Sequence, residues 1–288
     1  MSKLARREVN RLPIENVNPT GEFVSLAGAR YYAIRHADRI PPFFVSLISA
    51  SDHWLFVSST GGLTAGRISP ETALFPYITV DKIHDNALNT GSKTLLRVHS
   101  QDASYLWEPF NREHDGHFNI SRHLYKNTLG NKLRFEEINH DLQLAFSYSW
   151  ATSESFGFAR QCELKNLAGQ DVSIDLLDGL QNVLPAGTPM ASQTNASNLV
   201  DAYKWTELDK PTGLAYFTLY SGIADRAEPS ESLKANTVFC LGLESPTVLL
   251  CSEQLGRFRR GDTLHQENLK RGVRGAYLLN TSLQLRPG

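Results

Sequence analysis

The residues between His53 and Phe110 are the part of the chain whose types and spacing are best suited to chemistry. An apolar run, 53–60, enters the glycine turn 61–67 (GGLTAGR), and the tip 105–110 (YLWEPF) follows later. In an all-β protein, a strand that ends in a glycine corner, followed by an aromatic and acidic tip, predicts a rim that faces a sugar. The rest of the chain has no comparable concentration of such residues.

The tip offers two side chains with complementary chemistry for a pyranose. The indole of Trp107 can pack against the apolar C–H face of the ring, and the carboxylate of Glu108 can accept hydrogen bonds from hydroxyl groups. Pro109 keeps the tip out of a central strand, because proline cannot donate to a β ladder. The alternative is that Trp107 belongs to the core at the end of a strand.

The glycine turn has the Gly-x-x-x-x-Gly spacing of a phosphate-binding loop, from Gly61 to Gly66. Arg67 and Ile68 stand where that loop needs lysine and then serine or threonine, and no helix pattern follows. We therefore interpret the turn as a corner in which glycine allows positive φ and close approach of the backbone.

A polar stretch after the tip contains Arg112, His114, Asp115 and His117, with His123 farther on. Imidazole is the commonest protein ligand for metals, so a metal site is one interpretation. The spacing matches no standard metal motif. We favour a hydrogen-bonding loop, and we predict neither a metal nor a cofactor.

Two other sets of charged residues have structural alternatives to a chemical role. Asp175 and Asp178 could form an acid–base pair, but Asp178-Gly179 is also an ordinary turn signal and Asp175 falls on the exposed phase of its run. The basic segment 257–274 could bind phosphate or nucleic acid, yet it lacks the alternating aromatic residues of a stacking platform. We favour a turn for the aspartates and a solvated face, or a face meeting another domain, for the basic segment.

The composition fits a globular protein, with 41% hydrophobic and 20% charged residues among 288. A net charge of -1 argues against nucleic acid as a partner. The three cysteines are too few for a disulfide framework, and Cys162 and Cys240, which lie in apolar runs, are predicted to be buried thiols. No stretch approaches the about 20 apolar residues that span a membrane, and no signal peptide is visible. We therefore predict a cytoplasmic protein without a membrane partner.

Period-two patterns predict three antiparallel hairpins. The first joins 43–48 to 54–57, and the second joins 132–138 to 142–150, where Leu144, Phe146 and neighbouring large side chains share one face. The third joins 156–164 to 172–177.

Helices are few in the sequence pattern. Residues 79–88 predict a short helix that begins at Thr79 and ends before Gly91, and a second short helix is expected near 199–204. Residues 1–20 are polar and predict an N-terminal arm.

Together these patterns predict an all-β fold, a large two-sheet antiparallel sandwich with a few short helices. The absence of a fixed-period repeat argues against a propeller. Because two broad sheets can share one core, we expect a single domain over 21–288.

The order of the pieces resembles the N-terminal β-supersandwich domain of the cellobiose-phosphorylase-like glycoside phosphorylases and hydrolases. The resemblance covers residues 44–184, about half of the chain. In that family an early strand reaches an Asn/Ser-rich Gly-Gly turn, a Trp-x-Pro tip follows, and a later strand ends in a Leu-x-Asn turn. The corresponding pieces here are 58–62 (SSTGG), Arg67, 106–110 (LWEPF), 156–166 (FGFARQCELKN) and 171–180.

This resemblance implies a galactose-mutarotase-like supersandwich and a carbohydrate ligand. It also implies that the catalytic acid and the phosphate site belong to a following helical (α/α)6 barrel, so no catalytic residue is carried over to this chain. The candidate carbohydrate-binding residues are Arg67, Trp107, Glu108, Arg112 and His117.

We therefore expect a non-catalytic carbohydrate-binding or scaffolding domain of an enzyme that acts on oligosaccharides, with the barrel and a second copy of the chain as partners. The alternative is a free-standing mutarotase similar to aldose 1-epimerase. Mutarotation needs a general base and a general acid, usually Glu and His, on opposite sides of the ring oxygen and the anomeric hydroxyl. Whether the chain is itself an enzyme stays open at this point.

Overall fold

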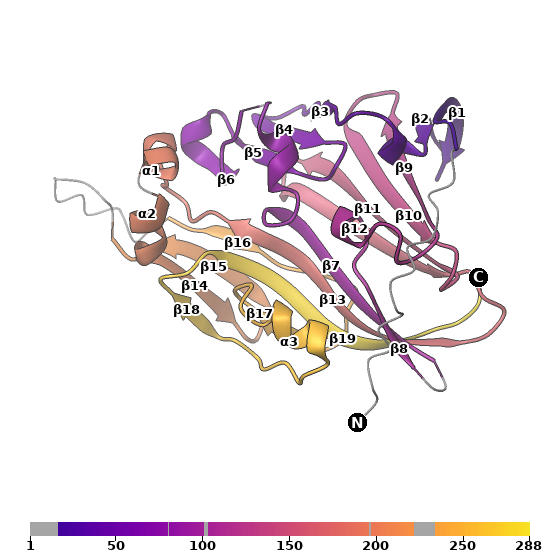
Figure 1. Ribbon diagram of the computed structural model, residues 1–288. Helices are drawn as coiled ribbons and strands as arrows, with labels where there is room; N and C mark the ends of the chain where they lie inside the picture. The colour runs from indigo at the N-terminus through magenta and orange to yellow at the C-terminus, as the bar shows by residue number, and fades with distance from the viewer. Residues whose placement is uncertain (1–16, 80, 101–102, 196, 222–233) are drawn as a thin grey trace. The chain divides into compact units, whose positions relative to one another are not determined.

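The computed structural model describes residues 17–79, 81–100, 103–195, 197–221 and 234–288, and these are built mainly from β-strands (Figure 1). The all-β class with a few short helices is thus confirmed. The strands pair into four hydrogen-bonded sheets, so the predicted grouping into two broad sheets is not confirmed. Most of the predicted N-terminal arm lies outside the described residues, and the first strand already begins at Thr20.

The contacts within the chain divide it into two compact units. Unit 1 comprises Met1–Gly61, Leu96–Asp175 and Ser282–Gly288, and unit 2 comprises Gly62–Leu95 and Leu176–Thr281. The single domain expected over 21–288 stays a prediction, and each unit is described by itself below.

The six-stranded sheet of unit 1 has the order β1-β2-β9-β10-β11-β12. Strands β10 and β11 pair so that Leu133 lies opposite Trp150 and Phe135 opposite Tyr148, and all four side chains are buried. The rings of Phe135 and Tyr148 stack with centroids 4.9 Å apart. The period-two pattern therefore predicted this hairpin correctly. The strands are β1 (Thr20–Leu26), β2 (Ala29–Arg35), β9 (Ile120–Asn127), β10 (Lys132–Asn139), β11 (Leu144–Ser153) and β12 (Gly157–Asn166).

The first predicted hairpin is also confirmed, as the antiparallel pair β3 (Phe44–Leu47) and β4 (His53–Ser58). These strands belong to a four-stranded sheet of order β3-β4-β5-β6. Its other strands, β5 (Leu63–Arg67) and β6 (Ala73–Phe75), belong to unit 2. The remaining short elements of unit 1 are η1 (Ala37–Arg39), β8 (Ser104–Trp107) and η4 (Arg112–His114).

The third predicted hairpin is wrong, because its two strands join different sheets. β12 pairs with β11, whereas β13 (Val172–Val183) lies in a five-stranded sheet of order β17-β19-β13-β7-β8. The side chain of Asn166 holds the turn between β12 and β13. Its Nδ2 donates to the carbonyl oxygens of Gln170 at 2.8 Å and Leu285 at 3.0 Å. The turn thus bonds to the last residue of β19 (Gly275–Leu285), the sheet neighbour of β13, while β12 and β13 remain in different sheets.

The five-stranded sheet contains the long strands β7 (Gly91–His99), β13 and β19 (Gly275–Leu285). Each of these strands contains a boundary between the two units, so the chain passes from one unit to the other within a strand. Asp178 and Gly179 lie inside β13, and the turn predicted for them is therefore wrong. The fifth strand, β17 (Thr247–Leu249), is paired with β19.

Unit 2 also contains a four-stranded sheet of order β16-β15-β14-β18. Alternate side chains of its central strands, such as Thr206 and Leu208 on β14 and Phe217 on β15, are buried. The bounds are β14 (Lys204–Asp209), β15 (Leu214–Leu219), β16 (Asn236–Val238) and β18 (Leu269–Arg271), and the helix α3 (Leu255–Arg260) occupies part of the basic segment.

The helix predicted over 79–88 is wrong; residue 80 lies outside the described residues, and the segment contains only the 3-10 turn η3 (Ile83–Asn86). Asn86 is buried, and its Nδ2 donates to the Leu63 carbonyl at 2.9 Å, which fastens the turn to β5. The helix expected near 199–204 is confirmed as α2 (Ser197–Tyr203). The helix α1 (Met190–Asn195), which the sequence pattern did not predict, precedes it. Unit 2 also contains the 3-10 turn η2 (Pro70–Thr72). None of the helices in the described part of the chain has both the length and the apolar character needed to cross a bilayer.

Candidate functional site

Trp107 is a core residue. It ends β8 with a side chain that is 2% exposed, and its Nε1 donates to Glu137 Oε1 at 2.7 Å. The second interpretation of the tip, a tryptophan buried at a strand end, is therefore the one that the structure shows. The ring does not present a face to a sugar in this conformation.

Glu108 is also buried, at 3% exposure. Its Oε2 accepts a hydrogen bond from Asn111 Nδ2 at 3.2 Å, and Asn111 in turn caps η4 through the backbone N–H of Glu113. Phe110, at the end of the tip, has a positive φ of 64°. Its backbone N–H donates to Glu137 Oε2 at 2.7 Å, so the tip is held by contacts within unit 1.

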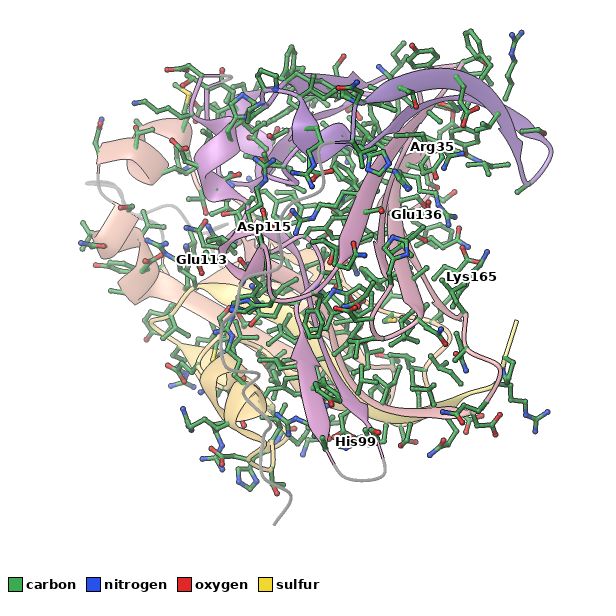
Figure 2. The ribbon with its side chains drawn as sticks, turned by 45° about the vertical axis from the view of Figure 1, so that its right-hand side comes forward. Arg35, His99, Glu113, Asp115, Glu136 and Lys165 are labelled. Carbon is green, nitrogen blue, oxygen red and sulfur yellow. The ribbon has the colours of Figure 1, made fainter. Side chains whose placement is uncertain are left out.

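Glu137 is the centre of these contacts. Besides the hydrogen bonds from Trp107 and Phe110, it accepts one from Arg122 Nε at 2.6 Å. Arg122 Nη2 lies 2.8 Å from Oδ1 of Asp115, which is labelled in Figure 2. Burial lowers the pKa of Arg122, but the carboxylates of Glu137 and Asp115 outweigh burial and raise it above its ordinary value. The guanidinium is thus a permanent cation that holds two acidic side chains in place.

The other sequence-predicted residues are more accessible. Arg112 is exposed and donates through Nη2 to the Asp38 carbonyl at 2.8 Å. His117 is half-buried, with its ring 5.3 Å from that of His114. Arg67 is exposed at the end of β5, in unit 2. The structure therefore brings Trp107, Glu108, Arg112 and His117 into one unit without gathering them around one cavity, and their role in sugar binding stays a prediction.

A small cavity in unit 1 has Arg112, Arg122, His123 and Phe110 among its lining residues. Its volume is about 30 Å³, which is the share of one water molecule in the liquid. His123 Nδ1 accepts a hydrogen bond from the backbone N–H of His36 at 3.1 Å. This cavity has room for a water molecule and not for a sugar ring.

Asp175 belongs to a hydrogen-bonded chain at the end of β7, near the His99 labelled in Figure 2. His99 Nε2 lies 2.8 Å from Asp175 Oδ2, and Asp175 Oδ1 accepts from Ser282 Oγ at 2.7 Å. The same three residue types form a nucleophilic triad when the imidazole stands between serine and aspartate. Here the serine bonds to the aspartate, so this order of contacts does not activate the hydroxyl.

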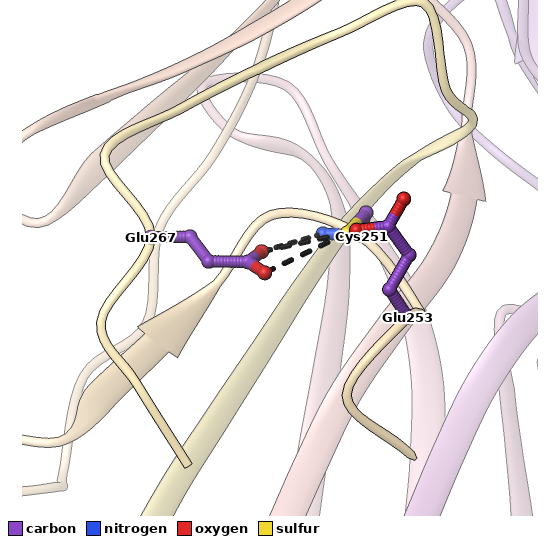
Figure 3. A group of neighbouring side chains, drawn as sticks. All are labelled: Cys251, Glu253 and Glu267. Atoms are coloured by element: carbon purple, nitrogen blue, oxygen red, sulfur yellow. Dashed lines mark hydrogen bonds between the residues drawn. The ribbon is translucent and has the colours of Figure 1, made fainter. Parts of the chain in front are cut away.

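Cys251, Glu253 and Glu267 in unit 2 offer three ligand atoms within 4.8 Å of one another (Figure 3). Lys270 Nζ, however, lies 2.6 Å from Glu253 Oε2 and 3.2 Å from Glu267 Oε1. Its ammonium supplies the positive charge that a metal would bring. Glu267 also accepts from the backbone N–H groups of Leu250 and Cys251. We interpret the group as a closed electrostatic cluster.

The prediction that Cys162 and Cys240 are buried thiols, which rested on local hydrophobicity, is wrong. Cys162 and Cys240 are exposed, and Cys251 is the buried thiol. Cys162 lies on β12 at the edge of the six-stranded sheet, where an apolar run does not ensure burial because part of such a strand faces solvent.

A larger cavity, of about 290 Å³, lies wholly in unit 2. Its neutral polar lining includes Tyr77, Asn86, Asn89, Thr90, Asn182 and Gln193. Three charged side chains, Asp201, Lys204 and Arg274, complete the lining. Thr188 and Ser197 line the cavity as well. We call the cavity defined by these residues the amide pocket.

The elements around the amide pocket are fixed by its own side chains. Gln193 on α1 accepts through Oε1 from the backbone N–H of Tyr77 at 3.0 Å and donates through Nε2 to the Thr188 carbonyl at 2.8 Å. Asn182 on β13, at a positive φ of 57°, donates through Nδ2 to Thr90 Oγ1 at 3.0 Å. Asparagine tolerates this left-handed conformation better than most residues. The pocket wall is therefore held in place by hydrogen bonds between elements.

The charged side of the amide pocket is an ion-pair triad. Asp201 Oδ1 lies 2.6 Å from Lys204 Nζ, and Asp201 Oδ2 lies 3.1 Å from Arg274 Nε. Loss of water around the buried ammonium lowers the pKa of Lys204, and the Asp201 carboxylate opposes that shift. The triad places two cations and one anion at the edge of a lining that is otherwise neutral.

Sequence reasoning missed the amide pocket because its residues come from elements scattered between Tyr77 and Arg274. The sequence predicts a helix over 79–88, which gives no indication that this segment forms a pocket wall. The available local signal was the density of Asn and Thr in 86–90. A cluster of short amides beside a glycine indicates turns as often as binding.

Comparisons with known proteins assign no family to this arrangement: no protein-family model matches the chain, and no curated protein matches it.

Proposed function

We propose that this chain is a non-catalytic carbohydrate-binding and scaffolding domain, and that the amide pocket of unit 2 holds one sugar ring. The observation that carries the proposal is the pocket itself, a cavity of about 290 Å³ whose lining is rich in amide and hydroxyl groups. That volume equals the share of about ten water molecules in the liquid, which suits a monosaccharide unit.

The chemistry of the lining supports a polyol ligand. A sugar hydroxyl both donates and accepts hydrogen bonds, and so do the amides of Asn89 and Gln193 and the phenol of Tyr77. The Oδ1 atom of Asn86 is buried and finds no hydrogen-bond partner among the described residues. That oxygen lies against Gly62, 2.4 Å from the position that a Cβ of residue 62 would take, so the groups that face a ligand are the amides and hydroxyls named above.

The parent enzyme in this proposal is a glycoside phosphorylase or glycoside hydrolase that acts on oligosaccharides. The sheets are then a galactose-mutarotase-like supersandwich, and the domain supports a helical (α/α)6 barrel and a second copy of itself in the cytoplasm. This part of the proposal rests on the order of sequence motifs between 44 and 184.

The pocket favours binding over mutarotation. Among the described residues that line it, none is a histidine or a glutamate, and its carboxylate and ammonium, Asp201 and Lys204, are paired with each other at 2.6 Å. A mutarotase needs a base and an acid that are free to exchange protons with the sugar.

Isothermal titration calorimetry with mono- and disaccharides tests the proposal. We expect binding by the unmodified chain, and a loss of about fivefold or more in affinity for the double variant Asn89→Ala with Ser197→Ala, which removes two polar groups from the lining. The matched control is Asn119→Ala, an exposed asparagine in unit 1.

Two results would contradict the proposal. Absence of binding across the saccharide panel would remove the pocket as a sugar site, and equal weakening by Asn119→Ala would show that the loss does not arise in the pocket. Polarimetry on the same samples measures the anomerisation of glucose and galactose. A rate well above that in buffer would show that the chain is a mutarotase and not a non-catalytic binding domain.

A further inference from the structure

We propose that the sugar held by the amide pocket carries an anionic group, a carboxylate or a phosphate ester, which Lys204 and Arg274 bind. This inference rests on the proposed function and specifies its ligand class. A purely neutral sugar would need only the amides and hydroxyls of the wall, so the charged side of the pocket calls for a separate explanation.

The first step is the charge balance of the pocket. Asp201 is the one carboxylate among the described lining residues, and it is shared by the two cations. Counting Lys204 and Arg274 as +1 each and Asp201 as -1 gives a net charge of +1 for the lining. An electropositive concave site raises the local concentration of anionic ligands.

The second step is the number of donors that the triad leaves available. Arg274 engages Asp201 through Nε, and its two terminal amino groups have no hydrogen-bond partner among the described residues. Those groups carry four of the five N–H donors of a guanidinium. A guanidinium edge of this kind matches the two oxygens of a carboxylate or phosphate.

The third step concerns Lys204, whose side chain is 7% exposed. A buried ammonium needs compensation, because removing it from water is costly. Asp201 supplies one partner through Oδ1 at 2.6 Å, and the ammonium has three donors in all. Since Asp201 also serves Arg274, a bound anion would provide the second negative charge that neutralises the pair of cations.

The two kinds of contact lie in one cavity, so a single ligand can use both. The neutral wall formed by Asn89, Thr90 and Gln193 recognises hydroxyl groups, and Lys204 with Arg274 recognises the acid. Uronic acids and sugar phosphates both have this combination. A simple anion has no hydroxyl-bearing ring to engage the neutral wall.

The experiment compares glucose, glucuronic acid, glucose 6-phosphate and inorganic phosphate by isothermal titration calorimetry at two salt concentrations. We expect at least one of the acidic sugars to bind about ten- to a hundredfold more tightly than glucose, the range of one or two charge-assisted hydrogen bonds. The advantage should shrink at high salt, because exposed charges are screened. The preferred acid identifies the source of the anionic group.

Arg274→Gln removes the charge and should weaken the binding of the acidic sugar at least about tenfold more than it weakens the binding of glucose. Arg274→Lys should restore part of the advantage. The control Arg286→Gln removes the same charge from an exposed residue of unit 1 and should have no effect. Circular dichroism of each variant checks that it is folded.

The outcomes separate this inference from the proposed function. Equal binding of glucose and both acidic sugars, unchanged by Arg274→Gln, would overturn the anionic ligand and leave the sugar site in place. Binding of no sugar would overturn both. Inorganic phosphate that binds as tightly as glucose 6-phosphate would show a plain anion site and would overturn the anionic sugar, whereas the binding of glucose alone decides the proposed function.

Discussion

The buried carboxylate of Glu137 holds the tip of unit 1, and we expect Glu137→Ala to destabilise the protein by about 3–5 kcal/mol. The side chain of Glu137 is 1% exposed. It accepts hydrogen bonds from Trp107 Nε1 and the Phe110 backbone at 2.7 Å each and from Arg122 Nε at 2.6 Å. Removal leaves all three donors without this acceptor and leaves Arg122 as a buried cation with only the half-exposed Asp115 beside it.

The magnitude follows from the number and kind of contacts. Hydrogen bonds to charged groups contribute about 1.5–3 kcal/mol each, and three of them would sum to more than the cost expected for breaking a buried ion pair. The range of about 3–5 kcal/mol is a better estimate than this sum, because the three donors share one side chain and part of the site can admit water once that side chain is gone. Glu137→Gln should lower the free energy of unfolding by less than Glu137→Ala, because the amide oxygen of glutamine can still accept a hydrogen bond. Some cost remains, because the amide NH2 group then faces a donor.

Urea unfolding followed by tryptophan fluorescence measures the effect, since Trp107, which contacts Glu137, is one of the four tryptophans of the chain. The control Glu163→Gln breaks an ion pair between Arg134 and Glu163, whose side chain is 41% exposed. It should change the free energy of unfolding by about 0–1 kcal/mol. Adding Arg122→Met to Glu137→Leu should recover part of the loss, because it removes the uncompensated charge. If Glu137→Ala costs no more than Glu163→Gln, the network does not stabilise unit 1 and the reasoning fails.

Two further predictions concern titratable groups. Burial lowers the pKa of His123 below 6.5, and its Nδ1 must be unprotonated to accept from the His36 backbone. The contribution of His123 to stability is therefore fully present above about pH 6.5 and is lost as the pH falls below that value. Between about pH 7.5 and 5.5, the free energy of unfolding should fall less in His123→Asn than in the unmodified chain. Burial also raises the pKa of Cys251 to about 12, so a disulfide reagent at pH 8 should modify Cys162 and Cys240 rapidly and Cys251 only after unfolding. Equal pH profiles for the two proteins, or three thiols modified at one rate, would contradict these predictions.

Local periodicity was enough to predict the hairpins of unit 1. In β11, Leu144, Phe146 and Tyr148 are buried on one face, and the two-residue period of these large side chains predicts a strand. The same period does not show that Ala145 and Ser147 on the other face are buried as well. The same rule could not choose the partner of a strand. β12 and β13 are adjacent in sequence and separated by a turn, but the amide of Asn166 bonds to Leu285, a residue 119 positions away.

Gly179 shows why a local turn signal can fail. Asp178-Gly179 has the composition of a turn, yet the pair lies within β13. A side chain at position 179 would place its Cβ 2.0 Å from the Tyr277 carbonyl oxygen. Glycine is required there by the close approach of a distant strand, which is a second role of glycine in sheets. Sequence alone does not distinguish the two roles.

The tip at Trp107 and the amide pocket show the same limit for function. The tip has the residue types of a sugar site, but Trp107 and Glu108 are engaged by Glu137 and Asn111 and are shielded from solvent. In the pocket, by contrast, ordinary residue types such as Asn89 become significant through position. A residue type indicates which chemistry is available, and burial and existing partners decide whether that chemistry remains available to a ligand. By that criterion the guanidinium of Arg274, which is 53% exposed and engaged through one of its three nitrogens, is a better binding group than the indole of Trp107.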